Sequence, residues 1–268
     1  MNRTITWAAT AALALSPLAL AASSTAAPSV HAKAAKTYSV TAKVNTDVAI
    51  AKEDTVKVKG RVTPKAKGQK VILQQRVGNK KKWTVTGSAK IKKNGTYKLT
   101  DKPTTPGSRE YRVLKPGSNG IKKGFSKPVQ VEVYRWENLA YRTAGPNTNI
   151  TPGGVNIGAQ FYGASLFTST ANTASTIEYT LGRKCIQLRA TYALTDESAT
   201  GATGAVTVSA DGTVVANKAL AVGTIFADET VDITDAFRLK IDATATAPAT
   251  APTAATAAVA TPEVLCTR

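Results

Sequence analysis

The amino-acid sequence predicts an all-β protein made of two β-sandwiches in series. Short segments in which apolar and polar residues alternate recur along the chain, and Gly, Pro and Asn bound them, which is the pattern of strands with one buried face. Charge divides the chain, with 26 Lys and Arg against 6 Asp and Glu over 33–135, but 8 against 11 over 136–268. Halves of such different charge predict two domains, which we place at 33–134 and 135–268.

The N-terminus has the layout of a secretory signal peptide, which we place at residues 1–32. Arg3 gives a positive start, an apolar stretch follows over 7–21, and small residues suited to cleavage lie at Ala21 and Ala32. The stretch is too short to cross a bilayer as a helix, so a membrane anchor is the alternative that we set aside. We expect a secreted, extracellular protein, associated with the cell wall, with no membrane span after signal cleavage.

Seven alternating segments predict the strands of the first sandwich. They are 38–44, 55–62, 70–77, 82–91, 95–101, 109–115 and 128–134. Their number and spacing are typical of a β-sandwich. The alternation over 82–91 places four side chains on the core side: Trp83, Val85, Ala89 and Ile91. By the same argument Tyr97 belongs to the core.

Lysines take the opposite parity in these segments, so we expect them to face solvent. They are densest at Lys80, Lys81, Lys82, Lys90, Lys92 and Lys93. One interpretation is a solvated face that keeps the protein soluble, and the other is a surface that attracts anionic polymers. Nucleic acid would feel the same attraction, but aromatic residues suited to base stacking are sparse here. We therefore do not expect nucleic acid as a partner.

This basic half resembles the bacterial Ig-like domains that occur as repeats in secreted actinobacterial proteins. The resemblance rests on the order G-x-V-x-P, G-x-x-V-x-L-Q, W, G-T-Y, P-G and Y-R-V within residues 60–113. It implies an Ig-like β-sandwich that serves as a spacer or adhesive module. It implies no catalytic residues.

Alternation in the second half predicts another sandwich, with strands expected at 153–163, 175–182, 185–194, 205–215 and 229–243. The run at 185–194 places Ile186, Leu188, Ala190, Tyr192 and Leu194 on the core side. The Asp211-Gly212 pair between apolar runs predicts a hairpin. Ala, Thr and Pro dominate 243–262, which we expect to be a poorly packed loop before a final strand.

The only two cysteines, Cys185 and Cys266, are predicted to form a disulfide, because export permits one. Cys185 has the parity of Gln187 and Arg189 rather than of the core residues, so we do not expect a buried apolar cysteine. Opposed positions on neighbouring antiparallel strands have the separation that a disulfide requires. We infer that the bond holds the terminal strand onto 185–194. The alternative is a pair of free thiols with a catalytic role.

The second half also resembles the NPCBM family of carbohydrate-binding modules over about 134–268. The motifs are W-x-x-L at 136–139, Y-x-L followed by C-x-x-L-x-A over 179–190, and V-D-I-T-D-A-F-R-L at 231–239. The resemblance implies a galactose-binding-like jelly roll, with a polysaccharide or cell-wall glycan as partner. The chain departs from the family at "ALTDES" and in its Ala/Thr/Pro tract.

Sugar binding needs an exposed aromatic ring with polar groups beside it. Four aromatic residues on or near the expected loops are candidates: Tyr141, Phe161, Tyr162 and Phe167. We pair Tyr162 with Asp196 as ligand-binding residues, and we expect Trp136 to pack at the domain junction. Carboxylate oxygens of Asp196 and Glu197 could hold a structural Ca²⁺ ion. No other cofactor is expected.

The chain offers no catalytic constellation. Its one histidine, His31, lies at or before the cleavage region, and no His and Cys cluster offers metal ligands. Paired carboxylates leave a glycosidase as an alternative, although such charges commonly cap turns. We predict a non-catalytic protein that binds cell-wall or extracellular polysaccharide and whose basic domain associates with anionic cell-wall polymers. The alternative is a structural or adhesive spacer held at the wall by electrostatics, without specific sugar binding.

Overall fold

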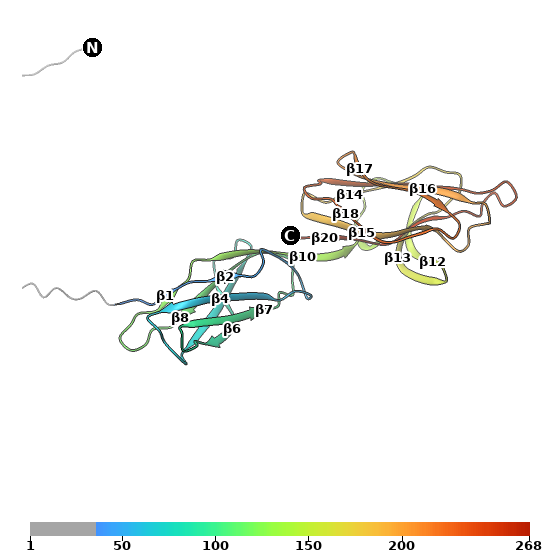
Figure 1. The fold of residues 1–268 in the computed structure, drawn as a ribbon. Coiled ribbons are helices and arrows are strands. Elements are labelled where there is room, and N and C mark those ends of the chain that lie inside the picture. Colours follow the sequence, from blue (N-terminus) through green and yellow to red (C-terminus); the bar gives the residue numbers. More distant parts are fainter. Residues whose placement is uncertain (1–35) are drawn as a thin grey trace, which may run out of the picture. The chain divides into compact units, whose positions relative to one another are not determined.

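The computed structural model describes residues 36–268, which form an all-β structure with one 3₁₀ helix, η1 (Leu139–Tyr141) (Figure 1). The predicted fold class is confirmed. The predicted signal peptide at 1–32 lies outside the described residues. Within the described part of the chain, no helix is long and apolar enough to cross a membrane.

One sheet of the first sandwich is built around a single long strand. That strand, β4 (Val56–Thr63), pairs antiparallel with three others: β1 (Ser39–Val40), β2 (Lys43–Val44) and β7 (Thr96–Asp101). Val56, Val58 and Val62 are buried, whereas Lys57 and Lys59 are exposed. The predicted alternation therefore holds in this sheet, and its lysines face solvent.

The facing sheet follows the order β6-β5-β8-β10. These strands are β6 (Thr84–Lys90), β5 (Lys70–Val77), β8 (Gly107–Lys115) and β10 (Val129–Asn138). Two short strands extend the sheet, namely β9 (Gly124–Phe125) beside β8 and β3 (Val48–Ile50) parallel to β10. Buried residues of both sheets form one core cluster, which includes Leu73, Tyr97 and Tyr111. The Ig-like assignment of this sandwich stays a prediction.

The second sandwich has a five-stranded sheet with the order β11-β14-β19-β16-β17. Its strands are β11 (Asn147–Thr148), β14 (Ser175–Thr180), β19 (Arg238–Thr246), β16 (Thr203–Ala210) and β17 (Thr213–Ala221). Asp211 and Gly212 connect β16 to β17 with φ values of 47° and 85°. Positive φ at both positions is the signature of a tight hairpin turn, so the predicted hairpin is confirmed.

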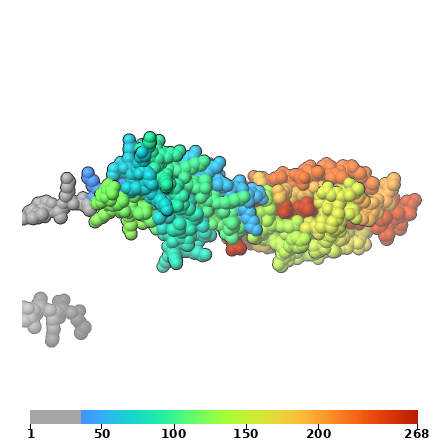
Figure 2. All heavy atoms as spheres, turned by 90° about the horizontal axis from the view of Figure 1, so that it is seen from below, coloured from blue at the N-terminus to red at the C-terminus, as the bar shows by residue number. Residues whose placement is uncertain are grey.

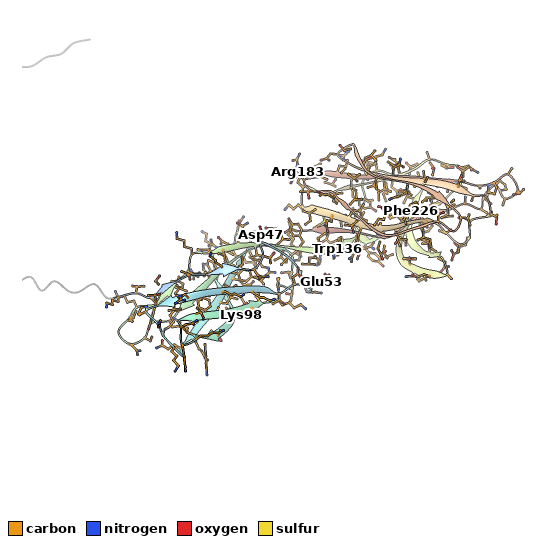
Figure 3. All side chains as sticks on the ribbon, in the orientation of Figure 1. Asp47, Glu53, Lys98, Trp136, Arg183 and Phe226 are labelled. Carbon is orange, nitrogen blue, oxygen red and sulfur yellow. A yellow bond between two sulfur atoms is a disulfide. The ribbon has the colours of Figure 1, made fainter. Side chains whose placement is uncertain are left out.

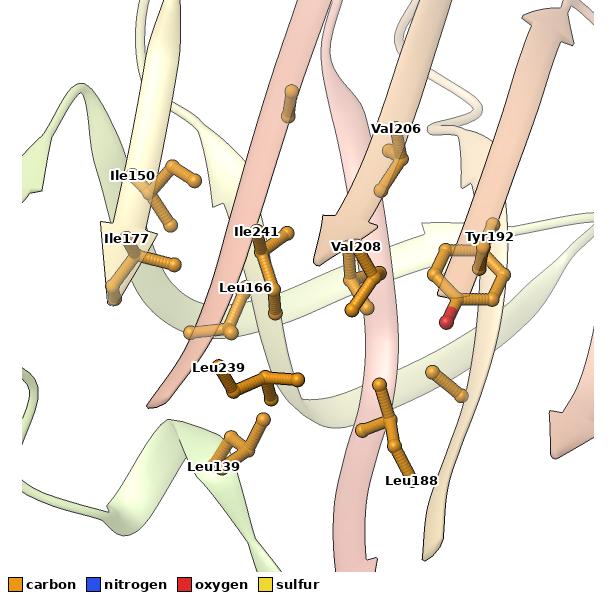
Figure 4. Packing of buried hydrophobic residues seen from close by; sticks show 14 of the residues in the cluster. Leu139, Ile150, Leu166, Ile177, Leu188, Tyr192, Val206, Val208, Leu239 and Ile241 are labelled. Carbon is orange, nitrogen blue, oxygen red and sulfur yellow. The ribbon is translucent and has the colours of Figure 1, made fainter. Parts of the chain in front are cut away.

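The facing sheet places β20 (Ala257–Cys266) between β13 (Gln160–Thr168) and β15 (Cys185–Leu194). Its edges are β12 (Ile150–Ile157) and β18 (Ile225–Asp232). Leu188 and Tyr192 of this sheet belong to one buried cluster with Val206, Val208 and Ile241 of the other (Figure 4). This cluster shares no member with the core of the first sandwich.

One strand takes part in both sandwiches. The first part of β10, residues 129–133, pairs with β8, and residues 135–138 pair with β20. The predicted boundary between 134 and 135 therefore falls inside a continuous strand rather than in a loop.

The prediction of a poorly packed loop over 243–262 is wrong. Its first residues complete β19, its last residues begin β20, and only 247–256 connect the two strands. Ala257, Ala258 and Ala260 are at most 1 % exposed. A low-complexity composition hides the strand because alanine has low β propensity, but its small side chain suits a strand that is covered on both faces.

The disulfide between Cys185 and Cys266 is present, and their Cα atoms are 4.0 Å apart. The two cysteines are register partners on β15 and β20, as predicted. The expectation that Cys185 is not buried is wrong, since it is 1 % exposed and joins the core cluster. A register shift between Cys185 and Gln187 inserts an extra residue, and such a bulge breaks the strict alternation on which the expectation relied.

The prediction that Trp83 and Val85 belong to the core of the first sandwich is wrong, and a second bulge is the reason. Val85 is 65 % exposed and Trp83 is half-buried, and neither belongs to the core cluster. Leu73 pairs with Gly87, but the next residue, Gln74, pairs with Val85. Residue 86 is thus skipped in the pairing, and this reverses the alternation before it. Trp83 and Val85 therefore lie on the outer face, while Ile91 stays in the core.

The predicted strand over 229–243 is two strands. β18 ends at Asp232 and β19 begins at Arg238, with Asp235 at a φ of 62° in the turn between them. Phe237 falls at this turn and is 44 % exposed, although its spacing matches the core residues Leu239 and Ile241. The uninterrupted apolar pattern conceals the turn, because its only local signal is Thr234-Asp235.

Candidate functional site

The hairpin formed by β12 and β13 carries the candidate site and has two different faces. Val155 and Ile157 of β12 are buried in a small cluster with Ala193, Ala258 and Ala260. These three alanines come from β15 and β20. The base of the hairpin continues their sheet, since β13 pairs with β20 at residues 165–167, while Val155 and Ile157 nearer its tip pack against the alanines. The residues of this hairpin, yellow in Figure 2, form part of the molecular surface in that view.

Phe161 lies on the outer face of the hairpin and is 68 % exposed. Its ring packs against the backbone of Gly154, where an added Cβ would lie 2.5 Å from Phe161 Cζ. An added Cβ on Gly163 would lie 3.4 Å from Phe161 Cε1. The glycines leave room for the ring to rest on the strands, so the hairpin presents an aromatic platform to solvent.

Polar groups lie beside this platform. Asn156 is the register partner of Phe161 across the hairpin, and partners of this kind project from the same face. The Nδ2 of Asn156 donates a hydrogen bond to Glu197 Oε1 at 3.4 Å. An amide and a carboxylate can exchange hydrogen bonds with the hydroxyl groups of a sugar whose apolar face covers the ring.

Asp196 holds the end of the hairpin in place. Its Oδ1 accepts a hydrogen bond from the Gly158 backbone N–H at 2.7 Å, and its Oδ2 accepts one from Ala159 at 2.8 Å. The backbone N–H of Asp196 donates to the carbonyl of Asn156 at 2.9 Å. Asp196 is therefore a positioning residue for Asn156, in addition to its predicted role beside a ligand.

The structure separates the other predicted aromatic residues. Tyr162 and Phe167 are partly buried and pack against the small alanine cluster beneath the hairpin. Tyr141 is 80 % exposed, but it belongs to η1 rather than to the hairpin. Of the four candidates, Phe161 combines high exposure with close packing on Gly154 and a polar register partner.

The predicted Ca²⁺ site stays a prediction. Among residues 36–268, no group of three or more His, Cys, Asp or Glu side chains is arranged to hold a metal ion. Both carboxylate oxygens of Asp196 already accept backbone hydrogen bonds. Glu197 is the carboxylate of the pair that accepts a hydrogen bond from Asn156.

The six predicted polyanion-binding lysines are all exposed. Lys80, Lys81 and Lys82 lie in the loop between β5 and β6, Lys90 ends β6, and Lys92 and Lys93 follow it. All six face solvent rather than the core, as expected.

Two further aromatic residues were not among the ligand-binding candidates from the sequence: Phe237 is exposed, and Trp136 is half-buried. Phe237 borders a groove of about 460 Å³ that Glu178, Asp211 and Lys240 also line. Backbone N–H groups of Phe237 and Arg238 hold the pKa of the Asp211 carboxyl below its usual value. Trp136, labelled in Figure 3, faces the Arg189 guanidinium at 4.1 Å on the part of β10 that pairs with β20.

The second sandwich thus presents one exposed aromatic ring, Phe161, with Asn156 opposite it on the β12–β13 hairpin. Residues 153–260 match the family model described as NPCBM/NEW2 domain. The chain therefore contains an NPCBM/NEW2 domain, which extends from β12 into β20 and includes Asn156, Phe161 and Glu197. No curated protein matches the chain.

Proposed function

We propose that this protein is secreted and non-catalytic, and that its NPCBM/NEW2 domain binds cell-wall or extracellular polysaccharide at Phe161. The exposed Phe161 ring, seated on Gly154 and Gly163, carries the proposal. A flat apolar ring covers the apolar face of a pyranose, while Asn156 and Glu197 bind its hydroxyl groups. The binding energy comes from burying apolar surface together with a few hydrogen bonds whose geometry the hairpin fixes in advance.

The basic first sandwich has a separate part in this proposal. With 26 Lys and Arg against 6 Asp and Glu over 33–135, it attracts anionic cell-wall polymers. This attraction weakens as salt rises, because exposed charges are screened within about 10 Å at 0.1 M ionic strength. Binding at Phe161 depends on stacking and hydrogen bonds, so it persists at high salt.

The test is Phe161→Ala in the mature chain, with binding to a panel of neutral polysaccharides measured by isothermal titration calorimetry at high salt. We expect affinity to fall by about fivefold to thirtyfold, since removing a central aromatic contact costs about 1–2 kcal/mol. Phe237→Ala is the matched control, because it removes another exposed ring, and its affinity should stay within about twofold of the wild type.

Any of three results contradicts the proposal. Equal affinity of the wild type and Phe161→Ala would remove the platform from the binding site. If the folded wild type bound no polysaccharide of the panel, the spacer or adhesive alternative would take its place. Turnover of a polysaccharide that is lost in Glu197→Gln would instead indicate a hydrolase.

A further inference from the structure

The outer face of the β6-β5-β8-β10 sheet exposes apolar and cationic side chains side by side. Solubility alone does not account for exposed apolar side chains. The bulge between β5 and β6 turns Trp83 and Val85 outward, and it leaves Val85 65 % exposed. Phe125 of β9 lies beside Leu114 of β8 and is 40 % exposed. Bulges often re-aim side chains toward functional surfaces, so this face is a candidate for binding.

Arg112 is held between the two aromatic rings on this face. Its guanidinium carbon lies 4.1 Å from the ring centroid of Trp83 and 4.4 Å from that of Phe125. Its Nε donates a hydrogen bond to Gln74 Oε1 at 2.9 Å. No acidic partner of Arg112 is found among residues 36–268. The side chain is therefore fixed in place before a ligand arrives, and its charge is not neutralised by an ion pair.

Arg76 connects this cluster to a groove. Its guanidinium carbon lies 4.9 Å from the Trp83 ring centroid, and it forms an ion pair with Glu110. Arg76 also lines a groove of about 390 Å³ together with Lys80, Lys81 and Gln130. Arg76 thus lies both beside Trp83, whose ring also contacts Arg112, and in the groove, and Glu110 is the acidic residue among those that line the groove.

We propose that this face is a defined binding site for an acidic polysaccharide that bears carboxylate groups. Arg112 binds one carboxylate through the planar, two-pronged geometry that guanidinium provides. Lys80 and Lys81 bind the carboxylates of neighbouring sugar units in the groove. Val85, which is 65 % exposed, contacts the apolar face of a sugar ring. The proposal rests on the association of the basic half with anionic polymers, and it replaces diffuse attraction by a specific site.

The arrangement favours an acidic glycan over single-stranded nucleic acid. Proteins that bind single strands without sequence preference stack successive bases on open aromatic faces. Here Arg112 lies over both rings, and Arg76 and Lys123 approach Trp83 and Phe125 as well. The rings hold cations in position, and the cations meet the ligand.

The test measures binding of polygalacturonate by the mature chain, with its fully methyl-esterified form as the uncharged probe. Arg112→Lys keeps the charge but loses the planar geometry, and we expect affinity to fall about fivefold to tenfold. Arg112→Gln and Trp83→Leu should lose about tenfold or more. Lys98→Gln, on β7 of the other sheet (Figure 3), changes the net charge as Arg112→Gln does. Its affinity should stay within about twofold of the wild type.

The outcomes separate this inference from the function on which it rests. If Arg112→Gln and Lys98→Gln weakened binding equally, and Arg112→Lys had no effect, the association would be diffuse and the defined site would be wrong. No binding of polygalacturonate at low salt would overturn both the site and the anionic-polymer role. Tighter, Trp83-dependent binding of oligothymidylate would show a nucleic-acid site instead. Thermal unfolding of each variant checks that the fold is intact.

Discussion

At the scale of single residues, the second sandwich contains both satisfied and unsatisfied polar groups. The exposed Asp196 carboxylate accepts two backbone hydrogen bonds and fixes the hairpin that carries Phe161. The Tyr192 hydroxyl, by contrast, lies in the core with no hydrogen-bond partner. Burial raises the pKa of Tyr192 to about 12, so the group stays neutral at physiological pH. A buried hydroxyl without a partner costs free energy of folding.

Tyr192→Phe removes that hydroxyl, and we expect the free energy of unfolding to stay the same or to rise by up to about 1 kcal/mol. Tyr111→Phe is the comparison, because the Tyr111 hydroxyl donates to Asp101 Oδ2 at 2.7 Å. Losing that charge-assisted bond should cost about 1.5–3 kcal/mol. Urea denaturation of both variants measures the difference. A clear loss of stability in Tyr192→Phe would show that the hydroxyl has a partner.

At the scale of elements, β20 shows how a strand can form from an Ala-rich tract. Its neighbours β13 and β15 pair with it on both sides. One of its faces joins the main core through Ala257 and Val259, and the other lies under the β12–β13 hairpin through Ala258 and Ala260. Alanine is small enough to let the hairpin approach the sheet, so the tract determines how closely the candidate site is seated.

Ala258→Val adds two methyl groups beneath the hairpin, where Ala258 is fully buried. Overpacking of this kind should lower the free energy of unfolding by about 1–3 kcal/mol. Ala249→Val makes the same change at an exposed position of the same tract and should alter stability by less than about 0.5 kcal/mol. Equal stability of the two variants in urea denaturation would mean that 258 is not packed as described.

At the scale of the whole molecule, the C-terminal strand is joined to distant parts of the chain. β20 pairs with β10, β13 and β15, and the disulfide links Cys266 to Cys185 across 81 residues of sequence. Beyond the strand, Thr267 Oγ1 donates to the Val133 carbonyl at 3.0 Å. The last residues therefore close the second sandwich and contact the strand that continues into the first.

The double variant Cys185→Ala with Cys266→Ala should lower the free energy of unfolding by roughly 4–5 kcal/mol, since it releases a closed loop of about eighty residues in the denatured state. Denaturation under oxidising conditions measures the loss. Dithiothreitol should destabilise the wild type but leave the double variant unchanged. A loss below about 1 kcal/mol would contradict a large stabilising role for the bond.

The sequence by itself determined the all-β class, most strand positions, the Asp211-Gly212 turn and the pairing of the two cysteines. Alternation and turn chemistry are local, so they can be read within a few residues. Phe161 could also be named as a candidate, but not ranked above Tyr141, Tyr162 or Phe167. Its rank depends on the glycines beneath the ring and on Asn156 across the hairpin.

Only the tertiary structure decided which side of the sheet Cys185, Trp83 and Val85 occupy, because bulges in strand pairing reverse the alternation. The tertiary structure also decided that an Ala-rich tract becomes a central strand. It further decided that Asp196 bonds the end of the hairpin and that Arg112 lies between two aromatic rings. These features depend on register between segments that are distant in sequence. Strand pairing and side-chain packing set that register, and no local pattern of residues encodes it.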